Sequence, residues 1–169
     1  LNRNWRGLVM DGSEAYIAAA RQDASYWRHD LTAISAFITA ENINTLIADA
    51  DFDEPLGLLS IDVDGNDYWI WNAINIVSPA IVVCEYNGIL GDMQPISIPY
   101  DPKFQRYRGH HSGHYFGCSL AALLHLAEKR GYTFVGTTST GINAFFVRND
   151  LAGTVTSLIE AVRSFPPRY

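Results

Sequence analysis

The chain has 169 residues, of which 48% are hydrophobic and 18% are charged, so it can bury a core and is not disordered. Its length is typical of a single domain. Its 12 basic and 18 acidic residues give a net charge of −6, which argues against binding to nucleic acid or to acidic membranes.

The first part of the chain predicts two strands, each followed by a helix. The apolar run at residues 7–10 predicts a strand, and the helix expected over residues 14–22 has Ser13 as its N-cap. A second strand is expected over residues 31–39 and a second helix over residues 42–48.

The middle of the chain predicts a strand that is buried on both faces. Residues 56–61 are apolar without alternation, as in a buried parallel strand, and a helix is expected to start near Asn66. Residues 80–84 predict the next strand of this kind.

The last part of the chain begins with a long irregular segment, residues 88–117. Loops of this length in compact domains are usually functional or mobile, so a substrate-side role is expected. A helix over residues 120–131 and a hairpin of residues 132–135 with residues 144–147 follow, and a final helix is expected around residues 155–162.

This order of elements predicts a single α/β domain over residues 1–169, with a doubly wound, mostly parallel sheet and a C-terminal antiparallel hairpin. Ligands of such sheets bind beyond the carboxyl ends of the strands. The polar clusters follow the predicted strands at those ends: Asp11, then Asp62 with Asp64, then Glu85 with Asn87.

Asp11 has two interpretations. An acidic residue at a strand end can accept hydrogen bonds from the two hydroxyls of a ribose. The alternative is an ordinary turn residue in Asp11-Gly12-Ser13, and no glycine-rich phosphate loop precedes it.

The segment Asp62-Val63-Asp64-Gly65-Asn66-Asp67 holds three carboxylates in six positions. Asp62 and Asp64 point to the same side if the strand continues, so they could share a cation or perform acid–base chemistry. The alternative makes Asp64 a turn residue and Asp67 a charge at a helix N-terminus.

Two other known motifs partly match the same segment. A magnesium-dependent phosphatase of the haloacid-dehalogenase type needs a later Lys followed by an acidic pair, which neither Lys103 nor Lys129 supplies. A calcium loop fails because Asp67 stands where Gly is required and Ala73 where the bidentate Glu is required.

Three of the five histidines, His110, His111 and His114, lie within five residues. They could bind zinc, act as a base or contact substrate, or simply be solvated loop residues.

Trp69 and Trp71 are expected to pack in the core. Cys84 and Cys118 form no disulfide framework, and no apolar run approaches the roughly 20 residues of a membrane span, so a cytoplasmic protein is expected.

Four segments together resemble the FkbM-like S-adenosylmethionine-dependent methyltransferases. They are WRGLVMDG (5–12), LSIDVDGNDYW (59–69), VVCEYN (82–87) and NAFFVR (143–148). The resemblance covers nearly the whole chain, and the string from Asp62 to Trp69 is its most specific part.

The resemblance implies a Rossmann-like sheet of strand order 3-2-1-4-5-7-6, with a glycine-rich cofactor loop after strand one. The chain, which starts at Leu1, opens on what would be strand two. We therefore expect a partial sequence of a longer enzyme, in which residues 7–10 and 56–61 are not paired with each other.

The resemblance also implies O-methylation of a sugar or other small-molecule hydroxyl, provided that the full-length chain carries the cofactor loop. S-adenosylmethionine would be bound by Asp11, Gly12, Ser13 and Asp62. The residues implied in catalysis are Asp62, Asp64, Glu85, Asn87 and His111, and Mg²⁺, if catalysis needs it, would bind the same oxygens. The alternative is a non-catalytic α/β binding module or fragment, a magnesium-dependent phosphatase of the haloacid-dehalogenase type ranks third, and the oligomeric state is left open.

Overall fold

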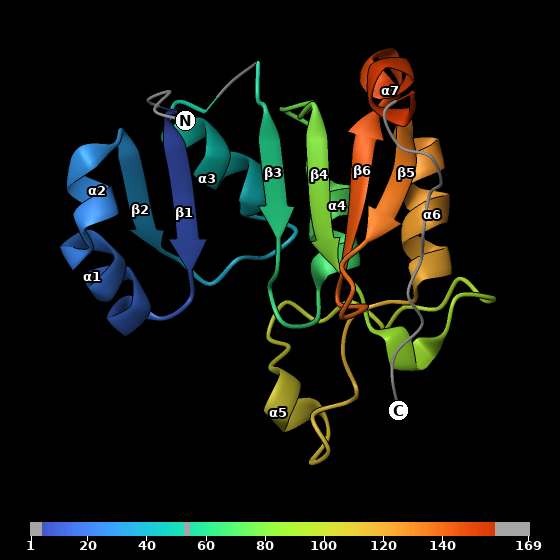
Figure 1. The fold of residues 1–169 in the computed structure, drawn as a ribbon. Coiled ribbons are helices and arrows are strands. Elements are labelled where there is room, and N and C mark those ends of the chain that lie inside the picture. Colours follow the sequence, from blue (N-terminus) through green and yellow to red (C-terminus); the bar gives the residue numbers. More distant parts are fainter. Residues whose placement is uncertain (1–4, 53–54, 158–169) are drawn as a thin grey trace.

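The computed structural model describes residues 5–52 and 55–157, and it places a two-stranded sheet beside a four-stranded one (Figure 1). The α/β class is confirmed. The described strands do not form one doubly wound parallel sheet, because the larger sheet is mixed and the smaller one has two strands. Within the described ranges, no helix has the length and apolar character needed to cross a membrane.

The smaller sheet pairs β1 (Gly7–Asp11) with β2 (Leu31–Ser35) in parallel. Helix α1 (Glu14–Gln22) starts as predicted, with Ser13 Oγ accepting a hydrogen bond from the Tyr16 N–H. A short helix that was not predicted, α2 (Ala24–Arg28), follows. Strand β2 is shorter than predicted because β1 ends at Asp11 and offers no partner backbone beyond it.

The larger sheet has the order β3-β4-β6-β5. Strand β3 (Leu58–Ile61) runs parallel to β4 (Ile81–Glu85). Strand β6 (Asn143–Arg148) is antiparallel to both β4 and β5 (Tyr132–Thr137), which confirms the predicted hairpin.

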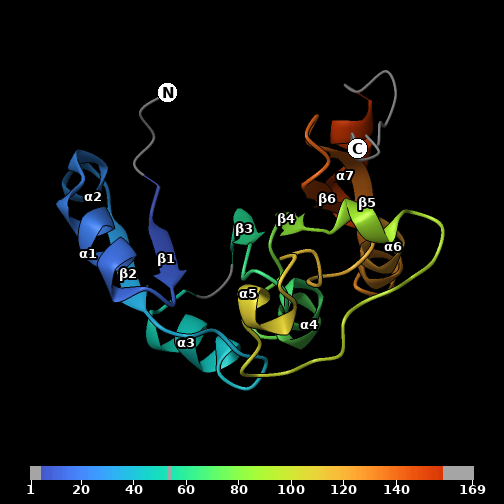
Figure 2. The same cartoon turned by 90° about the horizontal axis from the view of Figure 1, so that it is seen from below.

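Helices α3 (Ile43–Asp49) and α4 (Asp67–Ala73) lie to one side of β1 and β3 (Figure 2). Helix α6 (Leu120–Lys129) packs on β5. The core that these elements enclose is apolar and aromatic, with Ile70, Trp71, Val82, Leu123 and Phe146 almost completely buried.

Short helices occupy the irregular segment, namely η1 (Gly88–Leu90) and α5 (Arg106–Gly109). Helix α7 (Asn149–Thr156) begins earlier than the predicted final helix, because the chain turns into it directly after β6. The rest of that predicted helix, from residue 158 onward, lies outside the described residues.

Strands β1 and β3 run in the same direction but are not paired with each other (Figure 1). Their predicted separation is therefore confirmed. The prediction that residues 56–61 are buried on both faces is wrong: Leu58 is 46% exposed, because β3 is the edge strand of its sheet and has no described neighbour on the side of β1.

Candidate active site

The carboxyl ends of β3 and β4 bring three acidic residues together. Asp62 follows β3, Glu85 ends β4, and Asp67 begins α4; one carboxylate oxygen of each lies within 4.8 Å of the others. Parallel neighbouring strands end at the same edge of a sheet, which is why Asp62 and Glu85 meet although they are distant in sequence.

Asp67 holds the turn between β3 and α4. Its two oxygens accept hydrogen bonds from the Val63 and Gly65 N–H groups, at 2.8 and 3.0 Å. The turn needs this support because Asp64 and Gly65 have positive φ angles of 56° and 149°. The Asp67 side chain is fully buried, and this burial raises its pKa to about 6.

Glu85 is the buried acid of the site. The residue is 7% exposed, and Oε2 has no hydrogen-bond partner among the described residues. Burial, followed by the charges of Asp67 and Asp62, raises the pKa of Glu85 to about 8, while Arg106 opposes the shift. Glu85 therefore changes its protonation state close to neutral pH.

Arg106 is a site residue that sequence reasoning missed. Its Nη1 lies 3.3 Å from Asp64 Oδ1 and 3.8 Å from Glu85 Oε1. Its guanidinium stacks on the Phe116 ring, 3.5 Å from the centroid, and Nε donates to the Gly113 carbonyl. No local pattern marks this arginine, because it lies in the irregular segment and reaches the acids only through the fold.

Asp62 and Asp64 are exposed, and they form the solvent side of the site. Desolvation and the neighbouring Asp64 carboxylate raise the pKa of Asp62, against the opposing charge of Arg106. The two acids thus place negative charge on the solvent side of Glu85.

The irregular segment packs directly over the turn after β3. The Asn66 side chain donates to the Asp101 carbonyl at 2.9 Å, and the Gly117 N–H donates to the Gly65 carbonyl at 3.1 Å. A Cβ atom on Gly65 would lie 2.3 Å from the Phe104 ring, so this position requires glycine. The segment is therefore part of the site.

The Asn87 side chain anchors this segment. Its Oδ1 accepts from the Ile89 N–H, and its Nδ2 donates to the carbonyls of His114 and Phe116. These bonds leave little of the amide free to contact a ligand. Its place beside Glu85 at the end of β4 is nevertheless the one predicted.

The other predicted site residues lie apart from this acidic group. Asp11 Oδ1 accepts from the Ser13 N–H at 2.6 Å, which closes the turn at Gly12. His111 is exposed, and its ring centroid lies 4.1 Å from that of His110. The group of possible metal ligands found among the described residues contains neither Asp11 nor a histidine. Cys84 and Cys118 are buried free thiols.

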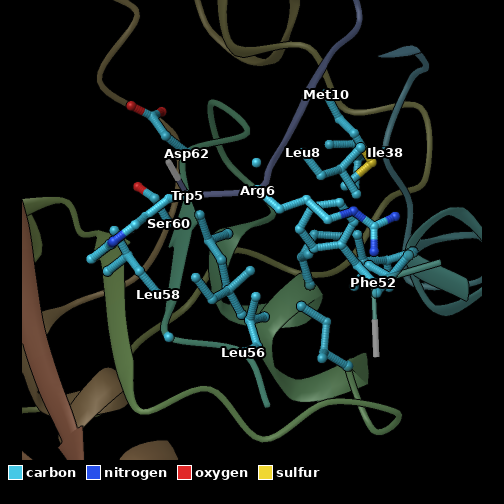
Figure 3. A pocket seen from close by; sticks show the side chains of 18 of the residues that line it. Trp5, Arg6, Leu8, Met10, Ile38, Phe52, Leu56, Leu58, Ser60 and Asp62 are labelled. Carbon is cyan, nitrogen blue, oxygen red and sulfur yellow. The ribbon is translucent and has the colours of Figure 1, made fainter. Parts of the chain in front are cut away.

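A pocket of about 730 Å³ separates β1 from β3 (Figure 3). Its walls include Leu8 and Met10 of β1 and Leu58 and Ser60 of β3, and Asp62 stands at the end of β3. Arg6 extends across the pocket onto the Phe52 ring, 4.6 Å from the centroid. Its floor is formed by Ile43 and Ile47 of α3, Ile70 of α4, and Ile74 directly after α4.

Comparison of the chain with protein-family models, with curated proteins and with solved structures finds no match.

Proposed function

We propose that the chain is an S-adenosylmethionine-dependent methyltransferase that acts on a hydroxyl oxygen of a sugar or another small molecule. The observation that carries this proposal is the buried Glu85 carboxylate with its unpartnered oxygen, at the strand edge where ligands of α/β sheets bind. A further support is strand order. If β1 is counted as the second strand of the order implied by the resemblance, the pair β2-β1 corresponds to its strands 3-2. The order β3-β4-β6-β5 then corresponds to its strands 4-5-7-6.

The charges of the residues at this edge are complementary to those of the cofactor. S-adenosylmethionine carries a positive sulfonium and ammonium group, and the exposed Asp62 and Asp64 provide negative charge at the edge. One Asp11 oxygen accepts a hydrogen bond from the Ser13 N–H, and the other oxygen would accept a hydrogen bond from a ribose hydroxyl, with Gly12 and Ser13 beside it. Bound there, the cofactor supplies an electrophilic methyl group.

The chain's own contribution is to orient the acceptor and remove its proton. Glu85 Oε2 would accept the hydroxyl proton as the oxygen gains the methyl group and the methyl carbon–sulfur bond of the sulfonium breaks, which would leave a methyl ether, a neutral thioether and a neutral Glu85. A base with a pKa of about 8 is well matched to this role near neutral pH. Asn87 and Arg106 hold the surrounding segment, and we retain Asp64 and His111 as candidates for contact with the acceptor.

Mg²⁺ is the cation that would suit this oxygen-rich group, with Asp62, Asp67 and Glu85 as the residues to hold it. Asp67 is already fixed by two backbone donors, and the Glu85 carboxylate already has Arg106 nearby. The proposed transfer does not depend on the ion, because Glu85 accepts the proton itself.

Calorimetry with S-adenosylmethionine tests the cofactor site. We expect a micromolar dissociation constant, or roughly −8 kcal/mol, for the unchanged chain, and weaker binding for the variant Asp11→Asn. Transfer of a labelled methyl group to a panel of sugars and phenols then tests the base. Glu85→Gln should keep cofactor affinity and lose transfer. A chain that gives no heat with the cofactor and no transfer contradicts the proposal.

The second candidate function is a non-catalytic binding module. The apolar pocket between β1 and β3, whose facing edges have no partner strand among the described residues, favours it. A chain that binds a peptide at those edges but neither cofactor nor acceptor would belong to this class.

A further inference from the structure

We propose that the acceptor is a sugar joined to a diphosphate, and that residues 102–115, the cationic segment, bind the diphosphate. This inference rests on the proposed methyl transfer, whose chemical step it leaves unchanged, and it names the class of acceptor. It follows from the distribution of charge along the chain, from the place of α5 beside Glu85 and from two cations without partners.

Charge is unevenly distributed along the chain. All 18 acidic residues lie outside residues 102–127, whereas this stretch contains three basic residues and four of the five histidines. The three basic residues and three of those histidines belong to the cationic segment. A chain of net charge −6 thus offers an anion one continuous stretch without a carboxylate.

The cationic segment lies directly beside the proposed base. Helix α5 lies beyond the carboxyl ends of β3 and β4 in both views (Figure 1 and Figure 2). Arg106 Nη1 lies 3.8 Å from Glu85 Oε1, and the Phe104 ring packs on Gly65. Asp11, the proposed ribose contact, ends β1 instead. With the cofactor on the side of β1, an acceptor hydroxyl at Glu85 leaves the rest of the acceptor to extend over α5.

Lys103 and Arg108 are the cations available to an anion. Both are exposed, and neither side chain has a hydrogen bond or ion pair with the residues that the structure describes. Asp101, the nearest acid in sequence, accepts from the Lys103 backbone N–H at 2.9 Å, and no ion pair joins the two side chains in the described part of the chain. Arg106 differs, because acids of the site already balance its charge.

The fold brings the backbones of Lys103 and Arg108 near one another. A Cβ atom on Gly109 would lie 2.9 Å from the Phe104 ring, so the chain neighbours of the two cations are in contact. Like charges at short range repel each other, and an anion between them removes the repulsion. Two cations match the two negative charges of a diphosphate that is esterified at both ends.

The turn after α5 adds a neutral donor. His110 Nδ1 accepts from the Ser112 N–H at 3.2 Å, so this nitrogen carries a lone pair and the proton of the neutral ring is on Nε2. Ser112 Oγ also accepts from the His114 N–H, which fixes the turn. The exposed His110 ring therefore offers an N–H group that can donate to a phosphate oxygen.

The position of Arg108 sets the length of the acceptor. Arg106 faces the acids, and Arg108 follows two residues later, about 200° around the helix axis, so its side chain leaves α5 on the opposite side. An anion at Arg108 and a hydroxyl at Glu85 are then separated by about one helix diameter, or about 10–12 Å. A sugar ring followed by two phosphates spans this distance. A sugar acid does not, because its carboxylate is attached to the ring itself.

Inorganic pyrophosphate, titrated calorimetrically into the full chain at low salt with EDTA, is the probe of the anion site. We expect saturable binding of one pyrophosphate per chain, and Arg108→Gln and Lys103→Gln should each weaken it by at least about tenfold. Arg28→Gln is the matched control, since Arg28 is also an exposed arginine in the last turn of a short helix. It should change the affinity by less than about twofold.

UDP-glucose then tests whether the anion site belongs to the acceptor site. It should displace pyrophosphate, and its kcat/KM for methyl transfer should exceed that of glucose and of glucuronic acid by at least about tenfold. Arg108→Gln should reduce this preference and leave transfer to glucose unchanged. The glucosyl diphosphate of citronellol carries the same diphosphate on an isoprenoid alcohol. Preference for either diphosphate over glucose supports the proposal, and the better of the two identifies the source of the diphosphate.

Three results would each overturn the inference. The first is no pyrophosphate binding, or equal affinities of Arg108→Gln and Arg28→Gln. The second is pyrophosphate that neither glycosyl diphosphate displaces, which would show an adventitious ion only. The third is equally efficient transfer to glucose and to both diphosphates, which would leave the proposed methyl transfer intact. Displacement of pyrophosphate without transfer to any acceptor would support the diphosphate site and contradict the methyltransferase instead.

Discussion

Replacing Glu85 by Gln should make the stability of the fold much less dependent on pH. Glu85 is buried beside Asp67, and its pKa is raised from 4.5 to about 8. Gln has nearly the same shape as the protonated acid but cannot ionise. The variant therefore keeps the packing and removes only the titration.

The direction in which stability changes with pH follows from the raised pKa of Glu85. Below pH 4.5 the carboxyl is protonated in both the folded and the unfolded chain, so Glu85 adds no pH-dependent penalty. Between pH 4.5 and about 8 the folded chain retains a proton that the unfolded chain has released, so stability falls as the pH rises. At about 1.4 kcal/mol per unit, a complete shift is worth on the order of 5 kcal/mol.

Urea unfolding at pH 5, 6, 7 and 8, with EDTA present to exclude divalent cations, measures this effect. The two proteins should differ by at most about 1 kcal/mol at pH 5. At pH 8 the variant Glu85→Gln should be more stable by about 2–5 kcal/mol. Asp67 titrates in both proteins, so it does not create the difference. Parallel stability curves for the two proteins would refute the assignment of a raised pKa to Glu85.

Three further substitutions, one of them with a matched control, test the surroundings of Glu85. Asp67→Ala leaves the Val63 and Gly65 N–H groups without their acceptor, and it should lower the unfolding free energy by about 2–4 kcal/mol in urea at pH 5. Gly65→Ala should cost about 2–4 kcal/mol in the same assay, because its Cβ would meet Phe104. Gly91→Ala is its matched control, since it has a positive φ but open space, and should cost only about 1 kcal/mol. Arg106→Ala removes a charge that lowers the pKa of Glu85, so the pH profile of methyl transfer should shift to higher pH. An unchanged profile would show that Arg106 does not influence the proposed base.

The local parts of the fold could be predicted because their causes are local. Ser13 caps α1 through a neighbouring N–H, and the hairpin of β5 and β6 joins residues close in sequence. The meeting of Asp62 with Glu85 was also predictable, since it follows from two parallel strands that end at one edge.

The parts that could not be predicted depend on contacts across the fold. Apolar residues at 56–61 indicate a strand but not which neighbours it has, and Leu58 is exposed because β3 lies at an edge. Arg106 lies 42 residues after Asp64, and nothing in its own segment indicates their ion pair. The sequence allows Asp67 to be interpreted as a charge at a helix N-terminus. In the structure its oxygens also accept the two backbone hydrogen bonds that close the preceding turn.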